Sequence, residues 1–415
     1  TTPAFDELLG PPRHPSEAFD FDSEDPTVRE RSQRWADLAA SAQLRLEEVL
    51  RELVAHAHTQ VPSKALCLAG GVALNAVANR RLAEEGPFEH LWVQPAAGDA
   101  GGALGAALWV WHDVLDNPRQ DRRFDCGLGR RWSPEAVGEL LTDLRAPREA
   151  LSAEERIRRA VDELVDGGVI GWFQGGCEYG PRALGHRSIL ADPRGADTRD
   201  RVNARIKFRE AFRPFAPAVT AEAAATFFDL HPALDGPLRH MVATADVRPE
   251  YREQLGAITH VDGSARVQVV HRESDPLFHA LIEAFGERTG LPVLLNTSFN
   301  LKGDPIADTP VDAMAVLYSS DLDALYIENH RVTRSQRVTG GDLQKVRLAG
   351  LAAMERGERD LALAYLQRLQ QQLPPGSEAA RVVANMLARA AATPPAGRGP
   401  GRVPGDGRGS DMVFQ

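Results

Sequence analysis

The sequence predicts an α/β protein, and two successive strand–turn–helix segments are the main reason. Residues 65–69 form an apolar run typical of a short buried strand, two glycines follow at 70–71, and the next residues have a helical pattern. The same order returns in the strand-like run 91–93, the glycine-containing loop 98–101 and the alanine-rich segment after it. Strands that alternate with helices across short glycine turns indicate an α/β domain.

A helix with one buried face is expected before these two segments. Residues 1–34 are rich in proline and acidic residues and are expected to be an irregular lead-in. The first domain then spans 35–115, and the polar, turn-rich segment 116–149 is expected to be a linker. The helix is indicated by apolar residues that recur three or four apart: Trp35, Leu38, Ala42, Leu46, Val49 and Leu53.

A second α/β domain is expected over residues 150–335. It begins with a helical segment at 154–166, which leads into a strand-like segment at 169–174. Further apolar runs at 267–270 and 293–295 have the length of buried strands. The two domains together make the fold class α/β throughout.

Residues 336–392 differ in kind from both domains. Alanine and leucine recur there at helical spacing and are interrupted at Gly357, which predicts a helical hairpin extension similar to a tetratricopeptide pair. This extension either docks a partner, such as a carrier protein, or is a packing appendage. Residues 393–415 contain ten Gly or Pro residues and are expected to be disordered.

Composition narrows the class of protein and its partners. The chain is 43% hydrophobic and 26% charged, as in ordinary globular proteins. Its net charge of -10 argues against bulk nucleic-acid binding, because proteins that track phosphates usually have a basic balance. The sequence contains no apolar run of 18 residues, so no membrane span is expected. Three cysteines in this length favour a reducing cytoplasm.

The stretch EYGPRALGHRS, residues 178–188, opens an unusually basic segment. From Glu178 to Arg213 there are nine arginines or lysines and five acids, in a chain that is acidic overall. Arginine presents a planar fork that matches phosphate or carboxylate, so a small anionic ligand is one interpretation. A solvated basic helix face, above all at Arg199, Arg201 and Arg205, is the other.

Two glycine-containing turns are candidate ligand contacts. Gly70 and Gly71 lie between a strand and a helix, where backbone N–H groups and the helix dipole can meet a phosphate, although such glycines usually serve tight turning. Asp99 lies between small residues at the second turn. The local sequence favours a helix N-cap there, and a metal or Mg-nucleotide ligand is the alternative.

Polar residues follow a buried strand in VLLNTSFN, residues 293–300. Short side chains at the end of a strand, here Asn296, Ser298 and Asn300, can hydrogen-bond a ligand, and ordinary turn chemistry is the alternative. Arg266 lies just ahead of another strand and is otherwise a surface hairpin residue.

Six segments, taken together, resemble the O-carbamoyltransferase family of nodulation and antibiotic-tailoring enzymes, in the family's order. They are CLAGGVALNAVAN, VQPAAGDAGGALGAAL, EYGPRALGHRSILADPR, IKFREAFRPFAP, HVDGSARVQ and LLNTSFNLKGDPI. The match covers residues 35–330. Six long motifs in one order are far more specific than any one of them.

The resemblance implies a partial actin-like ATPase lobe at 35–115, related to the universal tRNA threonylcarbamoyl transferase, and a YrdC-like domain at 150–335. In the YrdC-like domain of such enzymes, carbamoyl phosphate and ATP give carbamoyl adenylate and pyrophosphate. The carbamoyl group then moves to the other domain, where a metal helps to transfer it to a hydroxyl of an acceptor. The implied acceptor is a small molecule, either a natural product or a glycan.

The resemblance also implies roles for individual residues. Lys207, Arg209, Ser298 and Asn300 match the K-x-R…S-x-N pattern of YrdC-like domains. The residues expected to act on carbamoyl phosphate and the phosphates of Mg-ATP are Arg182, Lys207, Arg213, Arg266 and Ser298, because preorganised cations stabilise a transferring phosphoryl group. The residues expected to bind the nucleotide or carbamoyl phosphate are Arg209, Asn296 and Asn300, with Gly70, Gly71 and Asn75 in the actin-like lobe. Asp99 matches the aspartate that ligates the transfer-site metal, which is iron in relatives.

One part of the family is expected to be missing, namely the N-terminal lobe that supplies a histidine pair for the metal. No histidine pair spaced i, i+4 occurs in this sequence. The chain is then a fragment, a subunit that needs a separate N-terminal lobe polypeptide, or a protein that kept only the YrdC-like activity. Two further alternatives are a tRNA threonylcarbamoylation factor, which the acidic balance disfavours, and a non-catalytic partner-binding subunit.

Overall fold

The computed structural model describes residues 19–119, 124–143, 146–203, 206, 215–301 and 304–334, and a few single positions outside these ranges. Contacts divide the chain into a unit of Thr1–Leu141 with Pro147–Arg334 and a unit of Thr142–Ala146 with Ser335–Gln415. The elements below form the first unit. The expected helical hairpin at 336–392 and the expected tail at 393–415 lie outside the described residues, apart from single positions.

The first long helix, α2, spans Pro26–Gln60 and begins well before the predicted start at residue 35. Asp25 caps it by accepting a hydrogen bond from the Thr27 amide at 2.8 Å, and proline occupies the first turn. Both features are strong signals for the start of a helix. The expected irregular lead-in at 1–34 is therefore wrong for residues 26–34.

The two predicted strand–turn–helix segments are confirmed. Strands β1 (Ala65–Leu68) and β2 (His90–Val93) form a parallel pair, with the 3-10 helix η1 (Gly71–Leu74) and α3 (Ala76–Glu85) between them. Helix α4 (Asp99–Trp109) follows β2 and continues into the short π-helix η2 (Val110–Val114). Parallel strands need a crossover of this kind. A small core joins α2 to this pair through Val54, Leu82 and Phe88.

The segment 116–149, expected to be a linker, contains the helix α5 (Pro134–Asp143) and the strand β3 (Arg148–Ala150). Strand β3 pairs antiparallel with β13 (His330–Val332), so the chain joins the large sheet before residue 150. Its three residues are all exposed. An edge strand with a charged, solvated sequence carries no apolar pattern, which is why the sequence did not predict it.

The core of the molecule is a mixed eight-stranded sheet in the order β10-β6-β11-β5-β4-β12-β13-β3. Strand β4 is parallel to β12 and antiparallel to β5, and β6 is parallel to β10 and antiparallel to β11. The strands other than β3 and β13 are β4 (Val169–Phe173), β5 (Arg187–Ala191), β6 (Ala216–Thr220), β10 (Gln268–Val270), β11 (Val293–Ser298) and β12 (Ala324–Ile327). Every residue of β4, β5 and β6 is buried, as in a sheet covered on both faces.

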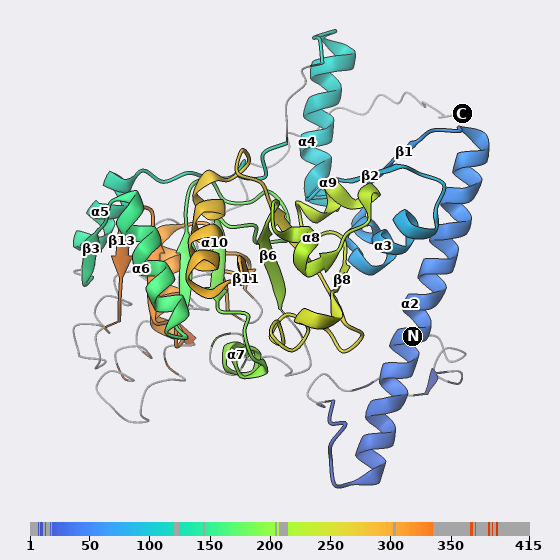
Figure 1. Ribbon diagram of the computed structural model, residues 1–415. Coiled ribbons are helices and arrows are strands. Elements are labelled where there is room, and N and C mark those ends of the chain that lie inside the picture. The colour runs from blue at the N-terminus through green and yellow to red at the C-terminus, as the bar shows by residue number, and fades with distance from the viewer. Residues whose placement is uncertain are drawn as a thin grey trace. The chain divides into compact units, whose positions relative to one another are not determined.

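Two helices, α6 (Ala153–Val165) and α10 (Pro276–Thr289), pack side by side against this sheet (Figure 1). Ser152 starts α6 with a capping box to Glu155, and Asp275 caps α10. A core cluster joins both helices to the strands and includes Val161, Leu164, Trp172, Phe278, Phe285 and Tyr326. A third helix, α11 (Pro310–Ser319), contacts β12 and β4.

Short elements occupy the segments between these strands. A three-stranded antiparallel sheet consists of β7 (Phe228–Asp229), β8 (Ala245–Val247) and β9 (Ser264–Ala265). The short helices are α7 (Ala196–Val202), α8 (Ala224–Phe227), η4 (Pro232–Leu234), α9 (Asp235–Leu238) and η5 (Pro249–Tyr251). Strand β2 contacts η4 and α9, so the β1–β2 pair packs directly against this region.

Polar contacts strengthen that packing. Buried Asn79 of α3 donates from Nδ2 to the carbonyl of Val242 at 2.7 Å. Its neighbour Arg80 makes a bidentate pair with Asp246 of β8, with both N–O distances 2.7 Å. Charge-assisted bidentate pairs fix orientation as well as adding energy.

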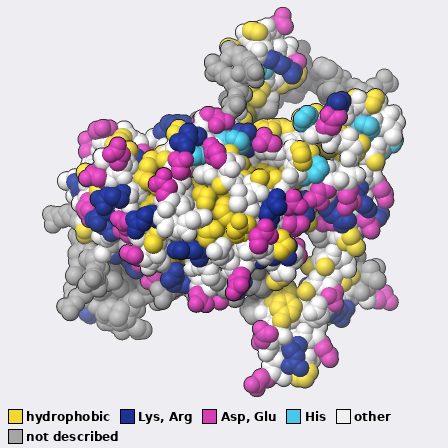
Figure 2. All heavy atoms as spheres, viewed as in Figure 1, with side chains coloured by type: hydrophobic (Ala, Val, Ile, Leu, Met, Phe, Trp, Pro, Cys, Tyr) yellow, Lys and Arg dark blue, Asp and Glu magenta, His cyan; other side chains and the backbone are white. Residues whose placement is uncertain are grey.

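On the face shown in Figure 2, lysine and arginine side chains are scattered among aspartates and glutamates, and hydrophobic side chains gather in the middle of the view. Mixed charge of this kind suits small ligands better than a long polyanion, which needs a basic stripe. Within the described part of the chain, no helix combines the length and the apolar character needed to cross a bilayer.

Candidate functional site

The stretch EYGPRALGHRS forms a closed loop ahead of β5, and Glu178 closes it. The Glu178 carboxylate oxygen Oε1 accepts hydrogen bonds from the amides of Leu184, His186 and Arg187 at 2.8, 2.9 and 3.0 Å. Glu178 is only 7% exposed. A buried carboxylate that collects several amides holds the backbone in one conformation. The sequence did not single out this role, although Glu178 stands first in the motif.

Arg187 is a structural arginine. It is fully buried, and its guanidinium carbon lies 3.5 Å from the centre of the Phe173 ring. Its Nη atoms donate to the carbonyls of Gln174, Gly175, His186 and Arg130 at 3.0–3.2 Å. With this many donors used inside the protein, Arg187 joins the motif loop to β4 and to the segment before α5.

Arg182 has a different environment. Its Nε atom is buried, and no described residue accepts a hydrogen bond from it. Burial lowers the pKa of the Arg182 guanidinium, and no carboxylate offsets that effect among the described residues. A desolvated cation without an internal partner is costly unless a ligand supplies the counter-charge. Arg182 therefore has the environment expected of an anion-binding residue.

Two amides hold the loop segment next to Arg182. The Asn296 Nδ2 donates to the Ala183 carbonyl at 3.3 Å and to Gln268 Oε1 at 2.8 Å. The Gln268 Nε2 in turn donates to the Leu184 carbonyl at 2.7 Å. Both amides are buried. Sequence reasoning predicted Asn296 but missed Gln268, whose signal was a single polar residue inside the apolar strand β10.

Strand register brings the predicted polar residues to one end of the sheet. Ser298, at the end of β11, lies opposite Ser188 at the start of β5. Asn296 lies opposite Ala216 at the start of β6, and Gln268 at the start of β10 lies opposite Ala218. Arg266 precedes β10 by two residues and is half-buried. The starts of β5, β6 and β10 and the end of β11 therefore lie at the same edge of the sheet.

Ser298 and Asn300 extend this edge. The Ser298 hydroxyl donates to Asn300 Oδ1 at 2.7 Å, and Asn300 Nδ2 donates to the Asp304 carbonyl at 2.6 Å. Both side chains are half-buried and have fixed orientations. The structure thus places Ser298 and Asn300 together, and Asn296 lies at the end of the same strand. Lys207, Arg209 and Arg213 lie outside the described residues.

The glycine turns form a second group at the carboxyl ends of β1 and β2. The Gly70 amide donates to the Ala97 carbonyl at 2.7 Å, and a Cβ on Gly98 would lie 4.0 Å from the Gly71 Cα. Gly70 has a φ of 96°, which favours glycine. No described atom lies within 4 Å of a Cβ placed on Gly70 or Gly71, so the turn is open to a ligand.

The structure gives Asn75 and Asp99 contacts that differ from those expected from the sequence. The Asn75 side chain caps α3 by accepting from the Ala78 amide at 3.1 Å, and it donates to Gln43 at 2.8 Å. Its polar atoms are thus committed to structure. The N-cap prediction for Asp99 is wrong, because Gly98 is the N-cap of α4 and Asp99 is the first helical residue. Asp99 is exposed, and it belongs to no cluster of three potential ligands among the described residues. One carboxylate does not fit a transfer-site metal.

The motif loop also contacts the turn after β2. The Tyr179 hydroxyl donates to the carbonyl of Ala100, the residue after Asp99. Gly180 has a φ of 144°, and a Cβ there would lie 2.9 Å from the Pro95 carbonyl oxygen. Only glycine allows the motif loop to pass so close to the turn after β2. This contact explains why residue 180 is glycine.

Comparison with known proteins agrees with this arrangement. Residues 161–334 match the family model for the carbamoyltransferase C-terminus, and residues 17–108 match the model for the carbamoyltransferase N-terminus. The second match overturns the expectation that the family's N-terminal lobe is missing.

Individual relatives include nodulation proteins and cephem O-carbamoyltransferases. The chain is 42% identical over 309 residues to the nodulation protein NolNO of Sinorhizobium fredii, covering 73% of this chain and 45% of the relative. It is 37% identical over 266 residues to a 3'-hydroxymethylcephem-O-carbamoyltransferase of Amycolatopsis lactamdurans, covering 64% and 48%. An uncharacterised protein of Synechocystis is 42% identical over 355 residues, covering 79% and 55%. The chain spans about half the length of the curated relatives it matches.

Proposed function

Because this chain belongs to the carbamoyltransferase family, we propose that it uses ATP to activate the carbamoyl group of carbamoyl phosphate and transfers that group to a hydroxyl of a small molecule. A relative named as a cephem O-carbamoyltransferase supports a small-molecule acceptor. The observation that carries the proposal is the buried Nε of Arg182, which has no partner among the described residues, next to Ala183, whose carbonyl bonds Asn296.

The first step is activation in the domain that contains the large sheet. Water cleaves carbamoyl phosphate to carbamate and phosphate, and a carbamate oxygen then attacks the α-phosphorus of Mg-ATP and displaces pyrophosphate. The product is carbamoyl adenylate. Negative charge develops on phosphoryl oxygens in this step, so fixed cations lower its barrier. Arg182 and Arg266 supply such charge from the described residues, and Lys207, Arg209 and Arg213 are proposed to complete the set.

Polar side chains at the same edge would orient the reactants. Ser298 and Asn300 are held by hydrogen bonds to each other and to the Asp304 carbonyl, so they present fixed polar groups to a ligand. Asn296 and Gln268 act as positioning residues, since they fix the backbone on either side of Ala183. Preorganisation of this kind keeps donors in place when the charge develops.

The second step is transfer of the carbamoyl group to the acceptor hydroxyl, with AMP as the leaving group. We place it at the turns after β1 and β2, where Gly70 and Gly71 leave open space beside a helix N-terminus. The contacts of Tyr179 and Gly180 with this region support a short path between the two steps. A transfer-site metal would need ligands in addition to Asp99, so no role is assigned to it.

The test is exchange of labelled pyrophosphate into ATP by the full chain, with and without carbamoyl phosphate. Exchange that depends on carbamoyl phosphate, and that acetyl phosphate does not support, is the expected result. Exchange without carbamoyl phosphate, or none with it, contradicts the proposal. Product analysis with an added hydroxyl acceptor then separates a chain that activates and transfers from one that only activates.

A further inference from the structure

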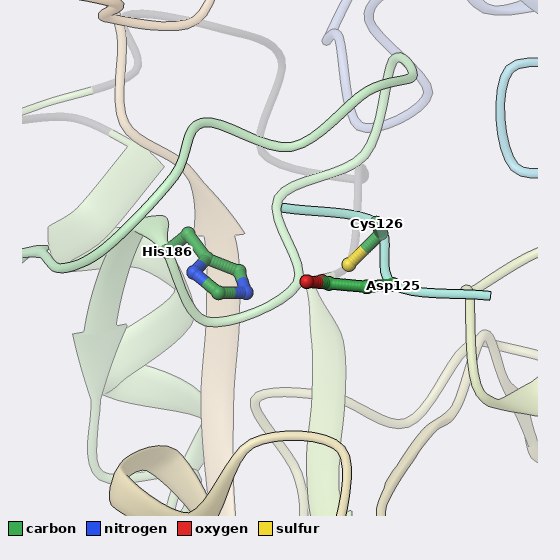
Figure 3. A group of neighbouring side chains, drawn as sticks. All are labelled: Asp125, Cys126 and His186. Atoms are coloured by element: carbon green, nitrogen blue, oxygen red, sulfur yellow. The ribbon is translucent and has the colours of Figure 1, made fainter. Parts of the chain in front are cut away.

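A cluster of metal-ligating side chains lies between the segment before α5 and His186 of the motif loop. Figure 3 shows Asp125 and Cys126 extending from one segment toward the ring of His186. One potential ligand atom from each of the three residues lies within 4.8 Å of the other two. Cys126 and His186 are half-buried, whereas Asp125 is exposed. The cluster borders a cavity of about 500 Å³ that is also lined by Asp275.

The orientation of His186 suits metal binding. Its Nδ1 lies 3.2 Å from the Gln174 carbonyl, which can only accept, so Nδ1 carries the proton and donates it. The other nitrogen, Nε2, is then free to present a lone pair, and it lies 3.8 Å from Asp275 Oδ2. Histidine ligands in proteins commonly donate their second N–H to a backbone carbonyl in this way.

The segment that carries Asp125 and Cys126 is fixed by its backbone. The Tyr179 amide donates to the Cys126 carbonyl at 2.7 Å, which ties this segment to the motif loop. Asp125 Oδ1 accepts from the Gly127 amide at 2.8 Å, so its carboxylate is already oriented. Backbone amides therefore hold both the Cys126 backbone and the Asp125 carboxylate in place.

The cluster carries an excess of negative charge. The carboxylates of Glu178, Asp125 and Asp275 all act electrostatically on Cys126. Glu178 is more than nine-tenths buried, and its Oε2 atom has no hydrogen-bond partner among the described residues. Two cations act on these three carboxylates, Arg131, which lies 3.5 Å from Asp125, and Arg187, which interacts with Glu178. A bound cation would offset the remaining charge and give the buried carboxylate a favourable field.

We propose that Asp125, Cys126 and His186, with Asp275 as the fourth ligand, bind a divalent zinc ion. One sulfur, one imidazole nitrogen and two carboxylates form a ligand set that zinc accepts, whereas magnesium and calcium prefer oxygen alone. Ligands of a tetrahedral zinc lie ~3.3–3.8 Å apart, from bond lengths of ~2.0–2.3 Å. The ligand atoms of Asp125, Cys126 and His186 need to close by ~1 Å, and Asp275, which lies 3.8 Å from His186 Nε2 and outside that three-residue cluster, must turn toward them. The ion would clip the segment before α5 to the motif loop.

Cobalt binding tests this site directly. The chelator-treated full chain is titrated with Co²⁺, and the expected result is one ion per chain with a thiolate-to-cobalt charge-transfer band that Zn²⁺ abolishes. Cys126→Ser should remove the band, and Cys177→Ser is the matched control that keeps it. Asp125→Asn should weaken binding by about tenfold or more without a risk to folding, because Asp125 is exposed. No band in the wild-type chain, or a band that survives Cys126→Ser, overturns the proposal.

A second measurement needs no variant. Alkylation of Cys126 by iodoacetamide is followed by peptide mass spectrometry with and without Zn²⁺, and Cys67 and Cys177 in the same chain serve as internal controls. Zinc should slow the modification of Cys126 and leave that of Cys67 unchanged. Equal rates for Cys126 in both conditions contradict a zinc site. The readout does not depend on pyrophosphate exchange, so it stands or falls separately from the proposed activity.

Discussion

Asn296 donates its side-chain amide to Gln268 at 2.8 Å, and this pair holds the two carbonyls that follow Arg182. The contact joins β11 and β10 to the motif loop through buried groups only. It therefore links the polar end of the sheet to the backbone that follows Arg182.

The first prediction concerns Asn296→Ala. The change leaves the Ala183 carbonyl and Gln268 Oε1 without this donor, so the free energy of unfolding should fall by ~1–3 kcal/mol. Carbamoyl-phosphate-dependent exchange should fall by about tenfold or more, because a misplaced cation stabilises charge poorly. The matched control is Asn79→Ala, which removes an equally buried asparagine that bonds Ala73 and Val242. Equal losses of exchange in the two variants would contradict a positioning role for Asn296.

The second prediction separates the two arginines of the motif. Arg187→Met should lower the free energy of unfolding by ~3 kcal/mol or more, since four carbonyls lose a charged donor. Arg182→Met should leave that free energy unchanged or raise it, because the buried Arg182 Nε has no partner among the described residues. Urea unfolding of both variants measures the difference. A loss of stability of similar size in both variants would show that Arg182 is structural too.

The third prediction is a pH dependence from His240. Burial lowers the pKa of His240 to about 4, from 6.5. In that range the unfolded chain binds a proton that the folded chain does not, so stability is lost as the pH falls from 6.5 to 4 and amounts to ~3 kcal/mol in all. His240→Phe removes this contribution and keeps an aromatic ring against Trp92 and Phe124. The stability difference between wild type and variant should therefore change with pH over that window, and a constant difference would refute the assignment.

The fourth prediction concerns the pair between α3 and β8. Hydrogen bonds from Arg80 lower the pKa of Asp246, so the contribution of this carboxylate is present above its ordinary pKa and is lost as the pH falls through the lowered one. Asp246→Asn should cost ~1 kcal/mol at neutral pH and less at high salt, because the Asp246 side chain is 38% exposed. Glu84→Gln, which removes a contact within α3, is the control and should cost less. A larger loss of stability for Glu84→Gln than for Asp246→Asn would show that the Arg80–Asp246 pair does not stabilise the contact between α3 and β8.

The sequence predicted β1, β2, β4, β10, β11 and α6 because their patterns are local, and it did not predict β5, β6, β12, α10 or α11. The strands at 65–68, 169–173 and 293–298 and the helix α6 follow from apolar periodicity and caps. The apolar pattern did not predict strand β3 or the first turns of α2, because an exposed edge strand and a polar helix start lack such a pattern. The register between strands is set by pairing over long sequence separations, which no single segment encodes.

The candidate site was predictable by residue type rather than by role. The motif indicated two arginines, but only the structure shows that the Arg187 Nη atoms bond four carbonyls. Asn75 looked like a ligand contact and is a helix cap. The cluster of Asp125, Cys126 and His186 combines residues about 60 positions apart in the chain, so no spacing rule could reveal it.

The central claim is that Arg182 binds the anionic substrates rather than the protein. The most direct measurement is carbamoyl-phosphate-dependent pyrophosphate exchange by Arg182→Met, beside Arg194→Met, whose arginine pairs with Asp192 at 2.6 Å. We predict that Arg182→Met loses roughly 100-fold or more of the exchange rate at unchanged folding stability, and that Arg194→Met keeps the wild-type rate. Exchange by folded Arg182→Met at the wild-type rate would contradict the account.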